Sequence, residues 1–250
     1  IISCQLIYAQ NDYDFKTFEK DSEKFIQQPS KWNAKDGLIL LGISSLTYSS
    51  MFFDRDVQSF ALQNNQYKNS LLVEFGRIWG EGWLSPSLGG LIYISGLANE
   101  NSHNKKIGYE ILSSSVYTGL ITMILKFGFG RERPTHNSNQ YSFYPLSFQG
   151  SNFLSLNSGH TALAFSTSTI LAKNTDNSFL KAAFYFPAFL TAFSRVYQNH
   201  HWLSDVILGG FIGYFVADFV TKIHVTKNYA KIVPDPNTVN FKLLNYSIYF

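Results

Sequence analysis

The stretch from Ser194 to Asp205 holds the residue types of a small reaction centre, with Ser194 and Arg195 followed by His201 and then Asp205. Residues four apart lie on one face of a helix, so the spacing predicts that Asp205 accepts a hydrogen bond from one ring nitrogen of His201. Such a bond fixes the imidazole tautomer and leaves the other nitrogen free to attack. His200 is disfavoured, because its spacing points it away from the carboxylate. A single pair of this kind is typical of a solvated surface, so its interpretation depends on the rest of the chain.

Two further polar groups lie at the ends of apolar stretches. Residues 126–134 (KFGFGRERP) end one apolar stretch, and residues 157–160 (NSGH) begin the next. Ser194 and Arg195 end a third stretch, and His201 and Asp205 begin a fourth. If consecutive helices run antiparallel, all these groups meet at one end of a bundle. The order of the motifs therefore predicts a single site.

The residue types in this site favour a phosphoryl group as the ligand. Lys126, Arg133 and Arg195 supply three positive charges, and the arginine fork matches phosphate oxygens in a bidentate way. Ser158 and Gly159 are predicted at a helix N-terminus, where free N–H groups and the helix dipole favour an anion. Gly159 also lets the backbone approach the ligand closely.

The two histidines can then divide the chemistry of phosphoryl transfer. His201, oriented by Asp205, is the candidate nucleophile and forms a phosphohistidine. His160 is the candidate general acid for the leaving oxygen, and it later activates water as a base. The cations and backbone donors stabilise the charge of the transition state. Carboxylates are too sparse around the motifs to predict a metal site, because Glu132 stands alone, and we expect no cofactor.

These motifs resemble those of the type-2 phosphatidic acid phosphatase and vanadium haloperoxidase superfamily. Its pattern is Lys-x6-Arg-Pro, then Pro-Ser-Gly-His, then Ser-Arg-x5-His-x3-Asp. Lys126 to Pro134 and Ser194 to Asp205 match the first and third motifs in full. The second motif departs from the pattern at Asn157, where proline is usual. Asn is itself a good helix cap, so we expect the site to survive this change.

The resemblance implies an all-α helical bundle that hydrolyses a phosphoester or pyrophosphate through His201, with no metal cofactor. It favours the membrane lipid phosphatase branch of the superfamily. Arg131, Glu132 and His200 have no counterpart in the motifs, so we interpret them as neighbours without a catalytic role.

The composition is typical of a protein in or on a membrane. Of 250 residues, 45% are hydrophobic and 15% charged, against about 25% charged in ordinary soluble domains. Phe and Tyr are abundant, with 23 and 15 copies. The net charge of +3 is too small and scattered to indicate a nucleic-acid partner. One cysteine, Cys4, excludes an intramolecular disulfide framework.

Six apolar stretches of helical length predict the core of the bundle, and Gly209, Gly210 and Gly213 predict a close helix contact in the last of them. The stretches are residues 37–53, 83–98, 107–125, 160–172, 179–193 and 203–221. The fourth and fifth are shorter than the ~20 residues of a membrane span, which leaves a soluble bundle as an alternative. Residues 54–82 predict an extra amphipathic helix across the active-site end. Glu81 and Trp83 could line a mouth there, although a solvated rim is the favoured interpretation.

The predicted organisation is an N-terminal segment (1–35), a helical phosphatase core (36–225) and a C-terminal tail (226–250). Residues 1–10 resemble the end of a cleaved signal peptide, although a buried or frayed segment is an equal interpretation. Residues 11–35 predict a short surface helix ending at Pro29, and residues 241–250 are strand-like.

Lysines such as Lys105, Lys173 and Lys222 lie at the helix ends remote from the motifs. The positive-inside rule makes that side cytoplasmic, so the site faces the periplasm or the exterior. We expect an integral protein of a bacterial-type cell membrane that removes phosphate from a phosphorylated lipid such as phosphatidate, phosphatidylglycerophosphate, polyprenyl diphosphate or lipid A. The alternatives are a secreted or periplasmic soluble acid phosphatase and a vanadium-dependent haloperoxidase.

Overall fold

A computed structural model describes residues 13–136, 139–146 and 150–230. The regular structure of this part of the chain is helical, which confirms the predicted all-α fold. The predicted terminal features, namely the signal-like residues 1–10 and the strand-like residues 241–250, lie outside the described residues.

The six apolar stretches form six helices, as predicted. They are α2 (Ala34–Met51), α5 (Leu84–Ala98), α6 (Ser102–Phe129), α7 (Gly159–Lys173), α8 (Ser178–Tyr197) and α9 (Leu203–Ala230). Short polar side chains begin several of them: Asn33, Asn101, Ser158 and Asn177 each accept hydrogen bonds from backbone N–H groups of the first turn. These caps satisfy donors that have no partner inside the helix.

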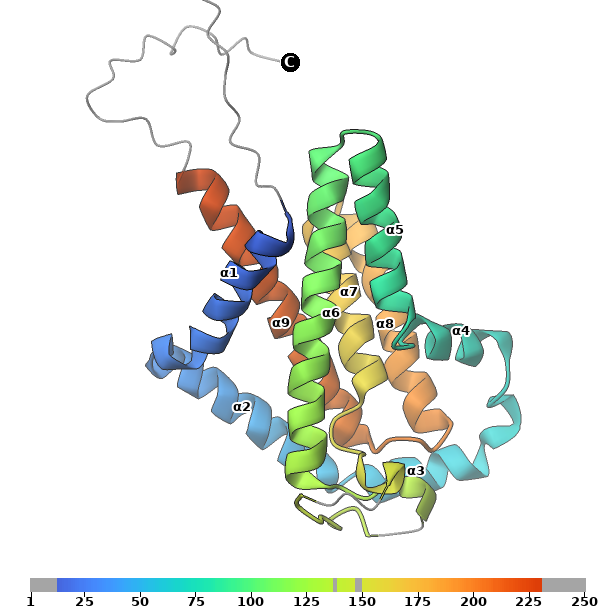
Figure 1. Ribbon diagram of the computed structural model, residues 1–250. Coiled ribbons are helices and arrows are strands. Elements are labelled where there is room, and N and C mark those ends of the chain that lie inside the picture. Colours follow the sequence, from blue (N-terminus) through green and yellow to red (C-terminus); the bar gives the residue numbers. More distant parts are fainter. Residues whose placement is uncertain (1–12, 137–138, 147–149, 231–250) are drawn as a thin grey trace, which may run out of the picture.

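Helix α7 lies at the centre of the bundle, against α6, α8 and α9 (Figure 1). Its contact with α9 depends on glycine, as predicted. A Cβ atom at Gly209 would lie 2.6 Å from the carbonyl oxygen of Ser158, and one at Gly213 would lie 2.0 Å from that of Ala162. Glycine therefore lets the two backbones touch, and this contact brings the start of α9 beside the start of α7.

Helix α1 (Phe15–Gln27) continues into a 3-10 turn, Gln28–Lys31. One face of this predicted surface helix is buried against the bundle. The Phe25 ring stacks on Tyr117 of α6 with 4.3 Å between centroids, and Asp21 Oδ2 lies 2.9 Å from Nε2 of His224 on α9. The N-terminal segment is therefore packed against the core by both apolar and charged contacts.

The predicted amphipathic helix of residues 54–82 forms two helices, α3 (Asp54–Gln63) and α4 (Leu71–Trp79), with a 3-10 turn at Asn65–Tyr67 between them. Helix α3 crosses the lower end of the bundle in Figure 1, and α4 lies beside α8. Helix α3 therefore covers the end at which α6 and α8 finish and α7 and α9 begin, whereas α4 covers the side of α8.

Two helices in the described part of the chain are long and apolar enough to cross a membrane, namely α6 and Leu203–His224 of α9. Helices α2 and α3 make a third candidate if this pair, bent by 51°, counts as one span. The number of candidate spans in this part of the chain is thus two or three, which is fewer than the six core helices. Large apolar side chains face outward on several helices, including Leu38, Leu91 and Phe189, each more than 60% exposed.

Candidate active site

The three motif segments meet at one end of the bundle, as their order predicts (Figure 1). Lys126 is in the last turn of α6, and Arg195 is in the last turn of α8. Gly159 begins α7, and Asp205 is in the first turn of α9. The contact between α7 and α9 joins these ends, because the N–H of Ser158 donates to the carbonyl oxygen of Asp205 at 3.0 Å.

The start of α7 differs in one detail from the prediction. Ser158, and not Asn157, is the N-cap, since its Oγ accepts from the N–H of Thr161 at 3.4 Å. Asn157 is buried, and its amide nitrogen lies 3.4 Å from Thr122 Oγ1. Asparagine at this position therefore packs against α6 instead of capping α7. A Cβ atom at Gly159 would lie 4.0 Å from Cε of Lys126, so the cap faces the lysine.

Lys126 and Arg133 are held by backbone oxygens of the loops that follow α6. The ammonium group of Lys126 donates to the carbonyl of Leu154. Arg133 Nε donates to the carbonyl of Ser151 at 3.0 Å, and Nη1 lies 3.4 Å from that of His200. These bonds restrict the direction of both cations without neutralising them. Burial lowers the pKa of Arg133.

Arg195 is the least satisfied cation of the three. It is 4% exposed, and its Nε and Nη1 atoms are buried without a hydrogen-bond partner among the described residues. Burial lowers its pKa to about 10, and the positive charge of Arg133 acts in the same direction. Buried donors are normally paired, so the guanidinium of Arg195 is suited to an anion that enters from outside the chain.

His201 is buried with a defined orientation. Its Nδ1 lies 3.0 Å from the carbonyl oxygen of Ser155. A carbonyl can only accept, so Nδ1 carries the proton and Nε2 has the free lone pair. Burial lowers the pKa of His201 to about 3, so the ring is neutral at physiological pH. A neutral imidazole with a free Nε2 is the state that a nucleophile requires.

His201 and Asp205 lie close together, but the distance between them is slightly too long for the expected direct hydrogen bond. Nδ1 lies 3.6 Å from Asp205 Oδ2, because His201 precedes α9 and the helical i, i+4 relation does not apply to it. Oδ2 instead accepts from Ser155 Oγ at 2.5 Å and from the N–H of Trp202 at 3.0 Å. The carboxylate thus acts on His201 mainly through Ser155 and the loop.

Arg131, interpreted from the sequence as a neighbour, is fully buried beside this carboxylate. Its Nη1 donates to Asp205 Oδ1 and its Nη2 donates to Asp54 Oδ2, both at 2.7 Å. The left-handed conformation of Gly130 (φ +57°) ends α6 and turns the chain just before Arg131. The sequence offered one indication that Arg131 belongs to the site, namely its position within the motif of residues 126–134. It offered no indication for Asp54, which lies far from every motif.

His160 has a carboxylate neighbour that the sequence interpretation placed in a solvated rim. Its Nε2 lies 3.5 Å from Glu81 Oε2, and Glu81 also pairs with Arg77. Burial and the charge of Arg195 lower the pKa of His160 to about 4, and Glu81 opposes both effects. His200, in contrast, is exposed and contributes its carbonyl to Arg133.

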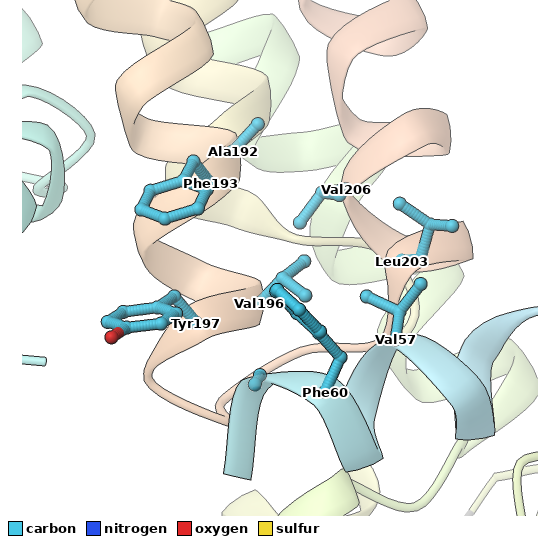
Figure 2. A pocket seen from close by; sticks show the side chains of 9 residues that line it. Val57, Phe60, Ala192, Phe193, Val196, Tyr197, Leu203 and Val206 are labelled. Atoms are coloured by element: carbon cyan, nitrogen blue, oxygen red, sulfur yellow. The ribbon is translucent and has the colours of Figure 1, made fainter. Parts of the chain in front are cut away.

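An apolar cavity of about 280 Å³ lies beside the loop that carries His201, between α3, α8 and α9 (Figure 2). Its lining residues are Val57, Phe60, Ala61, Ala192, Phe193, Val196, Tyr197, Leu203 and Val206. Val196 follows Arg195 directly, and Leu203 and Val206 flank the segment that contains Asp205. Hydrocarbon surface is therefore available next to the charged centre.

The family model described as the PAP2 superfamily matches residues 108–229. Over these residues the chain belongs to the PAP2 superfamily. The resemblance seen in the three motifs is thereby confirmed. The PAP2 region contains every residue predicted for the site, from Lys126 to Asp205, whereas Asp54 and Glu81 lie outside it.

Two known proteins are similar to this PAP2 chain. A lipid A 1-phosphatase of Porphyromonas gingivalis is 33% identical over 116 residues, which are 43% of this chain and 23% of the relative. The chain thus matches about a quarter of that relative's length. The crystal structure of Aquifex aeolicus LpxE is similar with a TM-score of 0.46 and 22% identity, over 64% of this chain and 94% of that one.

Proposed function

We propose that this PAP2 protein is a membrane phosphatase that hydrolyses a phosphate monoester or diphosphate of a lipid through a phosphohistidine on His201. The observation that carries the proposal is the buried guanidinium of Arg195, whose Nε and Nη1 lack a partner in the described chain. It lies with Lys126, Arg133 and the capped start of α7 at one end of the bundle. A phosphoryl group supplies the missing acceptors and the negative charge.

The first step joins the nucleophile to phosphorus. The lone pair on His201 Nε2 attacks phosphorus, and the bond from phosphorus to the lipid oxygen breaks. That oxygen keeps the electron pair and takes a proton from His160. Lys126, Arg133 and Arg195 offset the charge that develops on the other phosphoryl oxygens. The products are a lipid alcohol, or a lipid monophosphate from a diphosphate, and the phosphohistidine.

The second step returns the enzyme to its starting state. Water attacks phosphorus and gives one proton to His160, and the bond from phosphorus to Nε2 breaks with its electron pair returning to the ring. Inorganic phosphate leaves. His160 must enter the cycle protonated, although burial and Arg195 depress its pKa to about 4. A bound phosphate neutralises the neighbouring cations and raises that pKa, so substrate binding favours the acid form.

Three observations support a lipid as the substrate. In the described part of the chain, two or three helices are long and apolar enough to span a membrane. Large apolar side chains face outward on the bundle, and such surfaces mark membrane contact. The apolar cavity beside the His201 loop suits a hydrocarbon chain (Figure 2). Because a lipid A 1-phosphatase is similar to this chain, phosphorylated lipid A is the first substrate to test. We further propose that the site faces the periplasm or the exterior.

The test is phosphate release in detergent with excess chelator from lipid A, phosphatidate, phosphatidylglycerophosphate and polyprenyl diphosphate. The wild-type protein should release phosphate from at least one lipid, and His201→Ala should release none. His200→Ala is the matched control and should stay active, because His200 is an exposed neighbour. Release that survives in His201→Ala would exclude His201 as the nucleophile. Release from soluble esters alone would contradict the lipid substrate.

A further inference from the structure

A line of hydrogen bonds connects the first residue of α3 with His201. Asp54 Oδ2 accepts from Arg131 Nη2 at 2.7 Å, and Arg131 Nη1 donates to Asp205 Oδ1 at 2.7 Å. The other oxygen of Asp205 accepts from Ser155 Oγ at 2.5 Å. The carbonyl of Ser155 in turn accepts from Nδ1 of His201 at 3.0 Å. Ser155 thus connects Asp205 with His201: its side chain binds the Asp205 carboxylate, and its backbone carbonyl binds the His201 ring.

Every residue of this line is buried, and the side chains of Asp54, Arg131 and Asp205 are fully so. In such an environment a charged group without a partner is costly, so each carboxylate is held against the guanidinium in one arrangement. The guanidinium also lies over the rings of Phe143 and Trp202, at 5.5 Å and 5.6 Å from their centroids. These aromatic rings pack against the guanidinium of Arg131 and limit its movement.

Helix α3 is anchored to the same loop by a second set of bonds. Asp54 Oδ1 accepts from the N–H of Ser204 at 2.9 Å, and Oδ2 accepts from Ser204 Oγ at 2.7 Å. One turn later, Gln58 Nε2 donates to the carbonyl of Pro134 at 2.9 Å and to Asn199 Oδ1 at 3.1 Å. Helix α3 therefore holds both loops that carry the motif residues, although it lies outside the PAP2 region.

We propose that Asp54 and Arg131 are positioning residues for the reaction at His201, and that Ser155 transmits their effect; this inference rests on the proposed phosphohistidine chemistry. Asp54 fixes Arg131, and Arg131 fixes the rotation of the Asp205 carboxylate. Asp205 then holds Ser155 so that its carbonyl keeps the proton on Nδ1 and the lone pair on Nε2. Neither Asp54 nor Arg131 touches the phosphoryl group.

The test compares Asp54→Asn and Ser155→Ala with wild type and with Asp56→Asn. Asn keeps the shape of Asp54, and Ala keeps the carbonyl of Ser155. Asp56 is exposed in the same first turn of α3 and serves as the matched control. Three quantities are measured in detergent: the single-turnover rate of phosphohistidine formation, the inhibition constant of inorganic phosphate, and the tautomer of His201 from nitrogen-15 NMR of histidine-labelled protein. The His201→Ala variant assigns the His201 signals.

We expect both variants to slow phosphohistidine formation by about tenfold or more, as loss of an orienting hydrogen bond typically does. Inhibition by inorganic phosphate should stay at the wild-type value, because the cations that bind it are unchanged. The His201 signal should shift from the pure Nδ1–H tautomer toward a mixture, whereas Asp56→Asn should match wild type in all three quantities.

A folded Asp54→Asn or Ser155→Ala protein with the wild-type tautomer and rate would overturn the proposal. So would a parallel loss of affinity for inorganic phosphate, since it would show a general disturbance of the site. If wild type forms no phosphohistidine from any lipid phosphate, the proposed function fails, and the tautomer measurement then decides the positioning role by itself.

Discussion

The Nδ1 atom of His201 lies 3.0 Å from the carbonyl oxygen of Ser155. A backbone carbonyl therefore selects the tautomer, and the Asp205 carboxylate, 3.6 Å from the same nitrogen, acts one step further away. The consequence is a neutral ring whose second nitrogen is directed away from the carbonyl.

Replacement of Arg195 should separate ligand binding from stability. Nε and Nη1 of Arg195 are buried without a partner in the described chain, so Arg195→Met removes no internal hydrogen bond from them. We expect an unchanged or higher melting temperature in detergent. Vanadate affinity should fall by about tenfold to a hundredfold, because each lost charge-assisted hydrogen bond is worth about 1.5–3 kcal/mol. Lys181→Met, at the exposed start of the same helix, is the control and should change neither quantity. A large drop in melting temperature with vanadate affinity retained would contradict the role of Arg195.

Glu81 should set the basic limb of the pH–rate profile. Its carboxylate lies 3.5 Å from Nε2 of His160 and raises the pKa of that ring. In Glu81→Gln the protonated form of His160 loses this support, so the basic limb of kcat should move to lower pH. Glu74→Gln is the matched control, because Glu74 also pairs with Arg77 but does not contact His160. Identical shifts in both variants would show that the Arg77 pair, and not the His160 contact, is responsible.

Acid should destabilise the fold partly through His201. Its pKa is about 3 in the folded protein against an ordinary value of 6.5. Between these values the unfolded chain binds a proton that the folded protein does not, so the stabilising contribution is complete above pH 6.5 and is lost as the pH falls toward 3. The slope is at most about 1.4 kcal/mol per pH unit. Chemical denaturation of His201→Gln from pH 7 downward should show a shallower loss than wild type, and equal slopes would rule out this contribution.

The glycine contact between α7 and α9 should not tolerate a methyl group at Gly213. A Cβ atom there would lie 2.0 Å from the carbonyl oxygen of Ala162. Gly213→Ala should cost about 3 kcal/mol or more of unfolding free energy, since the two backbones must separate. Gly210→Ala is the matched control: its Cβ would meet the Phe165 ring at 3.6 Å, an ordinary contact. Thermal unfolding in detergent should therefore separate the two variants, and equal melting temperatures would contradict the close packing.

The sequence by itself determined the core helices and the residues that meet at one end of the helical bundle. Apolar stretches of helical length gave the six core helices, because burial of an apolar face depends on local pattern. The spacing of Lys126, Arg133, Arg195 and His201 relative to these stretches predicted one site, since antiparallel helices bring alternate ends together. The match to the PAP2 superfamily agrees with those motifs.

The tertiary structure alone decided which groups orient the reacting ones. Asp54 reaches Arg131 across 77 residues of chain, and Ser155 reaches Asp205 across 50. Glu81 likewise reaches His160 only because α4 packs against α8 and brings the residues after it beside the start of α7. The contact between His201 Nδ1 and Asp205 Oδ2 is longer than predicted, at 3.6 Å, for the same reason: α9 begins two residues after His201, so the two residues do not share a helical turn. Local pattern fixes which faces are apolar, whereas the direction of a buried polar side chain depends on partners that only the packed fold supplies.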